Sequence, residues 1–574
     1  MALTTLGSFR CCRAAALLVA AALPGWAQAP RQTPSALPPF TRSVDVTVTN
    51  VDVVVLDGKG NRVSGLRKED FEVSEDGIPQ PVTNFYAVEG GRVTFFGDEA
   101  VAAPAPVPGQ PAAAAAAEVP FPLPKTRIVI FIDNLHLTPF NRNRILKNVQ
   151  DFVRTSVKGD VEAMIITYEK GLHVRRKFTN DARDLADVLK QMEEISGLGL
   201  QDISEKREII QYIDEAQSED MAIQRVRQYA QSVNNDLQFT FDAMRTVLNQ
   251  LAGVDGRKIL LHVSEGLPQS PGAELWRYVQ DHFHSMSGLH NSFEFDKTAS
   301  YGGLVQAANA AGVTIYTIDA GGLSVDTSFS AENKTQKERM DTFTEKNNLQ
   351  SMLVLLAEET GGTAILNRND VTLPLKELEK DYTSYYSLGY RSLRGGADRP
   401  HKLDVKVKRK GLVVKARRSY MEKGVETKVT ESVVSALYFP RDDNPLSVGI
   451  EVGQAVPASD KQNFVVPIRV RIPFSRLTLL PEGTKLRGRV ALYFVVLDVS
   501  GNQSDMAKQN QPIELEGKTE ASLAKKDFLY EARLLMVPGG QRLSVAVRDE
   551  VTNTISYVQK SVFVSVLGSE TKKG

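Results

Sequence analysis

The chain has 574 residues, with 69 basic and 69 acidic side chains, so its formal net charge is zero. This length exceeds what one hydrophobic core usually organises and indicates several domains. The balanced charge, without a long basic run, excludes a typical nucleic-acid surface and attraction to anionic lipid.

The N-terminus carries the pattern of an export signal. Arg10 and Arg13 precede the apolar run AAALLVAAALPGW, which is shorter than the roughly 20 residues that a spanning helix needs. Small residues follow, which predicts a secretory signal peptide over residues 1–27, cleaved after Ala27. Both cysteines of the chain lie within it. We therefore expect an exported protein, periplasmic or extracellular, without a disulfide, a thiolate metal site or a membrane span after cleavage.

The sequence of residues 28–124 predicts a β domain between two irregular segments. Residues 28–42 are rich in proline and glutamine and are expected to form a disordered leader. The alternating stretch VDVTVTNVDVVVLD and the turn signal Asp76-Gly77 predict a small β domain over residues 43–97. Proline and alanine repeat over residues 98–124, which predicts a linker.

Strands and helices then alternate. TRIVIFID and GRKILLHVS are continuous apolar strands, typical of a sheet covered on both faces. GLHVRRKFT is expected to fold back on DVEAMIITY as a hairpin. The alternation predicts a doubly wound, Rossmann-like α/β domain over residues 125–422, with ligand loops at the carboxyl ends of its strands.

Residues 201–250 are charged and helical in composition and are predicted to form a helical insert in that domain. Long insertions near the ligand end of a domain are often functional. Two interpretations remain open, a surface that contacts a partner and a lid that only packs on the domain.

The C-terminal region is again rich in short strands, among them FVVPIRVRIPF, GRVALYFVVLD and QRLSVAVRD. Turn signals separate these strands. The pattern predicts an immunoglobulin-like β-sandwich over residues 428–568.

Four central stretches resemble a von Willebrand factor type A domain. They are RIVIFIDNLHLTP, DVEAMIITYEKGLHVRRKFTNDARDLADVLKQM, GRKILLHVSEGLP and AGVTIYTIDAGG. The flanking stretches GLRKEDFEVSEDGIPQPVTNF and YYSLGYRS look like the exported von Willebrand A-related proteins described from acidobacteria. The resemblance covers residues 43–422 and implies a Rossmann-like sheet whose end loops bind proteins.

The same resemblance implies a position for a metal-ion-dependent adhesion site, but its ligand set is degenerate here. In that family the first strand is followed by Asp-x-Ser-x-Ser, and Asp133 matches the aspartate. Leu135 and Leu137 stand at the two serine positions, Glu265 replaces an aspartate after the fourth strand, and Thr240 is the nearest candidate for a threonine. A hard cation such as Mg²⁺ needs oxygen ligands, which the leucines lack.

Two interpretations of this loop follow. A divalent cation would be held by Asp133, Thr138, Thr240 and Glu265, or Asp133 caps local amides and no metal binds. In the second case the loops offer contact residues for a partner. These candidates are Asn134, Leu135, His136, Leu137 and Gly266.

Other constellations predict no chemistry. His282, His284 and His290 follow the fourth strand without a metal-ligand spacing on one helix face, so solvated histidines are favoured over a zinc or copper site. His262 and Ser264 lack a nucleophile elbow such as G-x-S-x-G. No catalytic residue is predicted.

These features favour an exported, non-enzymatic protein-binding protein without a cofactor, whose protein partner and oligomeric state stay open. The first alternative is a cation-dependent adhesion or matrix-binding receptor that uses Asp133 and Glu265 with Mg²⁺ or another divalent cation. A hydrolase or processing factor is the second alternative.

Overall fold

The computed structural model describes residues 48–95, 124–195, 197–323, 336–392, 398–460, 462–517, 520–523 and 525–565. The predicted signal peptide, the leader and all but the last residue of the linker lie outside the described residues. The chain divides into two compact units, of which one is Val44–Lys423 and the other contains all residues from Gly424 onward. Within the described ranges, no helix combines the length and apolar character needed to cross a membrane.

A six-stranded mixed sheet forms the centre of the first unit, in the order β11-β10-β9-β6-β7-β8. Its strands are β6 (Thr126–Asp133), β7 (Val161–Tyr168), β8 (Leu172–Thr179), β9 (Arg257–Ser264), β10 (Val313–Asp319) and β11 (Ala364–Ile365). Neighbouring strands are parallel except for β8, which is antiparallel to β7. The hairpin expected from GLHVRRKFT is therefore confirmed.

Helices cover both faces of this sheet, as the continuous apolar strands predict. On one face the side chains of Ile128, Ile130 and Ile132 form one core with the helices α1 (Pro139–Ser156), α2 (Ala182–Gln191) and α9 (Thr372–Thr383). The residues of β10 that alternate with this core point the other way, and the Thr317 hydroxyl donates to the Leu353 carbonyl of α8 (3.0 Å). The helices α4 (Glu219–Ala252), α7 (Thr298–Ala311) and α8 (Gln336–Glu359) lie on that second side. The arrangement is the predicted doubly wound α/β layer structure.

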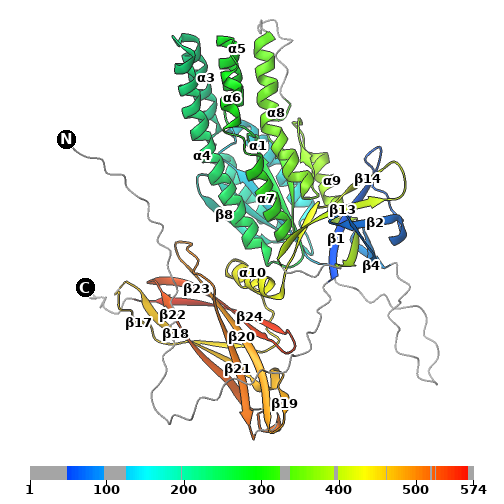
Figure 1. Ribbon diagram of the computed structural model, residues 1–574, viewed down its shortest axis with the longest axis vertical. Helices are drawn as coiled ribbons and strands as arrows, with labels where there is room; N and C mark the ends of the chain where they lie inside the picture. Colours follow the sequence, from blue (N-terminus) through cyan, green and yellow to red (C-terminus); the bar gives the residue numbers. More distant parts are fainter. Residues whose placement is uncertain are drawn as a thin grey trace. The chain divides into compact units, whose positions relative to one another are not determined.

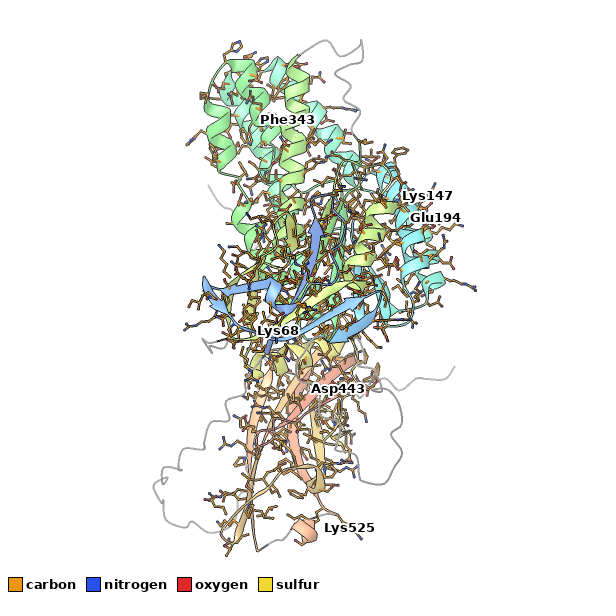
Figure 2. The ribbon with its side chains drawn as sticks, turned by 90° about the vertical axis from the view of Figure 1, so that its right-hand side faces the viewer. Lys68, Lys147, Glu194, Phe343, Asp443 and Lys525 are labelled. Atoms are coloured by element: carbon orange, nitrogen blue, oxygen red, sulfur yellow. The ribbon has the colours of Figure 1, made fainter. Side chains whose placement is uncertain are left out.

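Helices extend beyond the carboxyl ends of the strands (Figure 1). The extension contains α3 (Gly199–Glu215), the first half of α4, α5 (Ala273–Phe283) and α6 (Ser287–Phe293). It has a hydrophobic cluster of its own, in which Trp276 is 1% exposed. Figure 2 shows Phe343 of α8 beside this extension, at the other end of the unit from Lys68. Residues 201–250, the predicted insert, lie in α3 and α4.

The β region of the first unit is built from two distant parts of the sequence. Its sheets have the orders β14-β1-β12-β4-β5 and β15-β13-β2-β3. The strands are β1 (Val48–Asp57), β2 (Phe71–Glu75), β3 (Ile78–Gln80), β4 (Val82–Glu89), β5 (Arg92–Phe95), β12 (Tyr385–Arg391), β13 (Arg399–Val407), β14 (Leu412–Lys415) and β15 (Ser419–Glu422).

This pairing differs from the expected boundaries, which place residues 385–422 in the α/β domain and residues 43–97 in a β domain of their own. In the structure β12 inserts between β1 and β4, and β13 pairs with β2. The two sheets enclose a common core that contains Val53, Phe71 and Leu388. Strand pairing over about 300 residues satisfies both edges of β12, and no local pattern reports such a partner.

The second unit is a β-sandwich preceded by a helix. One sheet holds β16, β17, β18 and β22, and the other holds β19, β20, β21, β23 and β24, with a shared apolar core between them. Helix α10 packs on the outer face of the second sheet. The sequence did not predict this helix, because its valines and threonines are residues typical of strands. The bounds are α10 (Val425–Tyr438), β16 (Gly449–Val452), β17 (Val456–Pro457), β18 (Phe464–Pro473), β19 (Leu480–Glu482), β20 (Lys485–Asp498), β21 (Ala507–Glu516), α11 (Glu520–Leu523), β22 (Asp527–Met536), β23 (Gly539–Asp549) and β24 (Ile555–Val564).

Candidate functional site

The loops singled out in the sequence meet at the carboxyl ends of β6 and β9. Asp133 is the last residue of β6 and Glu265 directly follows β9. The Glu265 backbone N–H donates to the His136 carbonyl (3.2 Å), which joins the two loops. The strand order reverses between β6 and β9, and in open α/β sheets ligands bind outside the carboxyl ends at such a reversal. The predicted position of the site therefore coincides with the usual ligand position of such sheets.

Asp133, which matches the family's first metal ligand, is fully buried. Its Oδ2 lies 2.8 Å from Nδ1 of His136 and 3.8 Å from Nε2 of His262. His262 is fully buried too, whereas the His136 side chain is 18% exposed. Among the described residues, Asp133 Oδ1 and both ring nitrogens of His262 have no hydrogen-bond partner. The carboxylate thus faces two histidines of its own chain.

The electrostatics of this group favour an ion pair. Burial disfavours the charged carboxylate, but the charge and hydrogen bond of His136, followed by His262, outweigh it and hold the pKa of Asp133 well below its ordinary value. Burial also opposes protonation of His136, yet the charge of Asp133 raises the pKa of His136. Burial and the same charge raise the pKa of Tyr168, its neighbour on β7, to about 12. The negative charge of Asp133 is therefore balanced within the protein.

Glu265 accepts hydrogen bonds from residues at the N-terminus of α1. Its Oε1 accepts from the backbone N–H of Thr138 (2.5 Å) and from the Thr138 hydroxyl (2.6 Å), and its Oε2 accepts from Nδ2 of Asn141 (3.0 Å). The first backbone N–H groups of a helix have no partner within the helix, and a carboxylate there is also favoured by the helix dipole. Glu265 therefore caps α1 from another loop.

The loop leucines fill different environments. Leu137 is fully buried and belongs to the core under α1, whereas Leu135 is half-buried at the surface. Asn134 is also fully buried, and its Oδ1 accepts from Nη1 of Arg142 (2.8 Å). Burial removes Asn134 and Leu137 from the candidate contact residues. Their side chains hold the loop and α1 in place instead.

Thr240 and Gly266 have structural roles of their own. Thr240 is fully buried in α4, and its hydroxyl donates to the Asp236 carbonyl one turn earlier (3.1 Å). Gly266 has a φ of 116°, which favours glycine. A Cβ there would lie 2.5 Å from Cβ of Leu349, so the position also needs glycine for its close approach to α8.

The four candidate ligands do not fit a hard divalent cation. The two serine positions offer aliphatic side chains, and the Thr138 hydroxyl and both Glu265 oxygens hold the helix terminus. Only Oδ1 of Asp133 is an unused carboxylate oxygen in this set. Mg²⁺ and Ca²⁺ need about six oxygen ligands, so this donor set falls well short even with water.

A cleft with a cavity volume of about 490 Å³ lies above these loops. Leu135, His136 and Gly266 contribute to its floor. Much of the rest is lined by the helical extension and by the middle of α8, and loops at the carboxyl ends of the strands complete the lining. This volume is within the range of about 300–1,000 Å³ that is usual for ligand sites.

The cleft is acidic, with seven carboxylates and three lysines in its lining. Lys206 of α3 is its central cation, because Nζ lies 2.8 Å from Glu345, 2.9 Å from Glu274 and 3.2 Å from Asp202. Burial opposes the charged ammonium, but these carboxylates, with Glu274 the strongest, raise the pKa of Lys206. Lys206 was not predicted as a site residue from the sequence. Of its three carboxylate partners, only Asp202 is close to it in sequence, at the i,i+4 spacing of an ordinary helical ion pair.

Asp319, at the end of β10, also lines this cleft and was not singled out in the sequence. Its carboxylate accepts from Nε2 of Gln350 (2.6 Å) and from the Gly321 backbone N–H (2.9 Å). Burial outweighs these hydrogen bonds and raises its pKa. Its place at a strand's carboxyl end was the available sequence signal.

The histidine-rich stretch forms no metal cluster among the described residues. His282 Nδ1 lies 3.5 Å from Oδ1 of Asp214, and His284 ends α5 with a positive φ. Across the part of the chain that is described, one group of three potential ligands converges, namely Glu75, Asp76 and His401. His401 Nδ1 lies 2.9 Å from Asp76 and 3.2 Å from Glu75, so these side chains already contact one another across β2 and β13.

No family model and no curated protein matches this chain. Among solved structures, the hypothetical protein BatB from Bacteroides thetaiotaomicron is 9% identical and covers 45% of this chain and 97% of its own, with a TM-score of 0.22. An aerotolerance-related membrane protein from Bacteroides fragilis is 12% identical, over 45% and 98%, with a TM-score of 0.21. A von Willebrand factor type A from Catenulispora acidiphila is 9% identical, over 77% and 67%, with a TM-score of 0.20. Scores this low carry no argument about this chain.

Proposed function

We propose that this chain is an exported, non-enzymatic protein-binding protein that takes its partner in the acidic cleft without a metal ion. The observation that carries the proposal is the internal use of the carboxylates at the family's metal position. Asp133 is buried against His136, and Glu265 caps α1. A partner that bridged a cation at these residues would have to displace both structural bonds.

The chemistry of the cleft supports a basic partner. Its seven carboxylates outnumber its three lysines, and unlike charges across an interface accelerate association and select partners. Two of these carboxylates stand apart from Lys206. Among the described residues, the Asp236 side chain of α4 forms no hydrogen bond or ion pair, and Glu205 faces Arg225 at 3.7 Å, the long end of an ion pair. We propose that a lysine- or arginine-rich segment of a protein binds there.

Export is supported by the sequence pattern of residues 1–27, and the absence of enzymatic activity is supported by the structural engagement of Glu265 and His136. The alternative, a cation-dependent adhesion receptor, requires Asp133 to bind Mg²⁺, Mn²⁺ or Ca²⁺. Calorimetric titration separates the two. We expect no binding heat with these cations at about millimolar concentration, and cation binding that disappears in Asp133→Asn would overturn the metal-free proposal.

Partner binding is tested with a variant that fills the cleft. Ser232 of α4 is exposed and lines the cleft, so Ser232→Trp fills it without removing a bond of a buried group. Gln231→Trp, at the neighbouring exposed position outside the cleft lining, is the matched control. Lysine- and arginine-rich peptides are titrated in the presence of EDTA. We expect binding to the unaltered chain and to Gln231→Trp, and at least about tenfold weaker binding to Ser232→Trp.

Equal binding to both tryptophan variants would place the contact elsewhere. Binding that requires a divalent cation would support the receptor alternative instead. An acidic peptide series of the same length controls for nonspecific association, because an acidic cleft repels it.

A further inference from the structure

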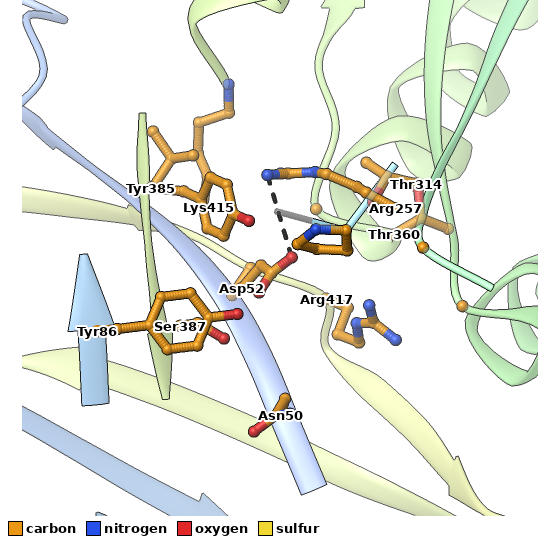
Figure 3. Close-up of a pocket in the computed structure, with 16 residues that line it drawn as sticks. Asn50, Asp52, Tyr86, Arg257, Thr314, Thr360, Tyr385, Ser387, Lys415 and Arg417 are labelled. Carbon is orange, nitrogen blue, oxygen red and sulfur yellow. Dashed lines mark ion pairs between the residues drawn. The ribbon is translucent and has the colours of Figure 1, made fainter. Parts of the chain in front are cut away.

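A second cavity, with a volume of about 240 Å³, lies at the opposite end of the central sheet. One wall is formed by residues at the amino ends of β9 and β10 and before β11, and the other by the outer face of β1, β4 and β12 (Figure 3). The cavity lies within the first unit and shares no residue with the acidic cleft. It is a separate candidate site.

Two arginines give this cavity its charge. Arg257 begins β9, and its Nη1 lies 4.0 Å from Oδ2 of Asp52, too far for a hydrogen bond. No described residue forms a hydrogen bond with this Nη1. Its guanidinium lies 4.4 Å from the centre of the Tyr385 ring, which fixes its plane. Among the described residues, no hydrogen bond or ion pair joins the guanidinium of Arg417, which follows β14.

The positive charge is not balanced by the cavity's own residues. Lys415 is satisfied, since its Nζ donates to Oδ2 of Asp381 (2.8 Å). That leaves Asp52 as the carboxylate of the lining, opposite Arg257 and Arg417. Burial lowers the pKa of Arg417, and the charge of Arg257 adds to this effect while Asp52 opposes it. A further cation is close by, because a Cβ on Gly312 would lie 3.8 Å from both Arg417 Nη1 and Lys258 Nζ.

Hydroxyl groups complete the wall opposite the arginines. Ser387 is 1% exposed, and its Oγ makes no well-formed hydrogen bond with any described residue, although it lies beside the Tyr86 hydroxyl. Figure 3 shows Ser387 and Tyr86 together on the wall that faces Arg417. A buried polar group without a partner is costly, and so is a partly buried guanidinium without a counter-ion. Both costs are relieved by one bound oxyanion.

We propose that this cavity binds the phosphate group of a small ligand between the guanidinium groups of Arg257 and Arg417. The planar guanidinium donates two parallel N–H groups to phosphate oxygens, which makes arginine the usual residue for this purpose. The carboxylate of Asp52 accepts a hydrogen bond from protonated phosphate, which sulfate cannot offer. The volume is below the usual range of about 300–1,000 Å³ for drug-sized ligands, so the ligand is small.

The test is calorimetric titration of the full-length chain with inorganic phosphate, with glycerol 3-phosphate and with sulfate. We expect saturable binding of at least one phosphate probe and weaker binding of sulfate. The tighter of the two phosphate probes identifies the source, as a free ion or as an ester. Bound phosphate also raises the melting temperature, because it binds only the folded chain.

Arg417→Gln is the decisive variant and Arg418→Gln is its control. Arg418 is the next residue, is 59% exposed and pairs with Glu359 at the surface (2.9 Å). We expect phosphate binding to weaken at least about tenfold in Arg417→Gln and by less than about twofold in Arg418→Gln. Without phosphate, Arg417→Gln should melt no lower than the unaltered chain, since it removes an unpaired, partly buried charge.

Three outcomes would overturn the assignment. They are no binding and no rise in melting temperature at about 10 mM of either phosphate probe, sulfate binding as tight as phosphate, and equal phosphate affinity in the two arginine variants. An Arg417→Gln chain that melts lower would make the side chain structural, and Arg257→Gln then repeats the binding test at the second guanidinium.

Discussion

At the scale of single residues, the loop after β6 holds a fully buried aspartate without the further oxygen ligands that a hard cation needs. Asp133 ends the strand, and its counter-charge comes from His136, while His262 Nε2 lies 3.8 Å away. Buried charges persist in proteins when a partner compensates them, and the histidine ring does so here. The stability that the Asp133–His136 pair contributes to the folded chain therefore depends on pH.

His136→Gln should destabilise the first unit mainly in mild acid. The folded-state pKa of His136 is raised, so its contribution is complete below the ordinary value of 6.5 and is lost as the pH rises through the raised value. Asp133 has a lowered pKa, so its contribution is present above its ordinary value of 3.8 and is lost only as the pH falls through the lowered value. We expect a loss of about 2 kcal/mol in unfolding free energy near pH 5.5 and a smaller loss near pH 9.

Urea unfolding followed by the fluorescence of the buried Trp276 measures this difference. His173→Gln, at an exposed position of β8, is the control and should change stability little at either pH. Equal losses at both pH values in His136→Gln would show that the histidine contributes by packing and not by charge.

At the scale of elements, the helical extension is held to α8 by Lys206. Its ammonium joins α3 to α5 through Glu274 and to α8 through Glu345. The helices also share an apolar cluster around Trp276. The extension therefore has its own core and its own electrostatic link, which explains how so polar a segment is ordered.

Lys206→Met should cost about 3 kcal/mol, because it leaves three neighbouring carboxylates without their common cation while it keeps the aliphatic stem. Arg154→Met, which breaks an exposed i,i+3 pair with Asp151 on α1, should cost at most about 0.5 kcal/mol. Both are measured as unfolding free energies by Trp276 fluorescence. Similar values for the two variants would show that Lys206 does not hold the helical extension to α8.

At the scale of the whole molecule, the first unit is closed by strands from both ends of its sequence. Because β12 lies between β1 and β4, the N-terminal strands lack their central partner until residue 385 is reached. Long-range pairing of this kind forms late and only as a whole. Strands that are close in sequence therefore do not by themselves form a separate domain here.

Truncation tests this directly. A chain of residues 44–423 should fold, whereas residues 44–384 should leave the segment 48–95 open to protease, since β1 and β4 then expose unpaired edges. Residues 424–574 should fold separately. Limited proteolysis with mass spectrometry measures the protection of 48–95, and equal protection in both longer chains would contradict the shared sheet.

The sequence by itself determined the central sheet, because continuous apolar strands and amphipathic helices are local patterns with fixed periods. It also determined that Leu135 and Leu137 cannot bind a cation, since this follows from composition alone. The tertiary structure decided what no local pattern reports, namely that β12 pairs with β1 and β4, that Glu265 caps α1, and that Arg257 and Arg417 line one cavity. These residues lie from about 120 to more than 300 positions apart in the sequence, and only the folded chain brings them together.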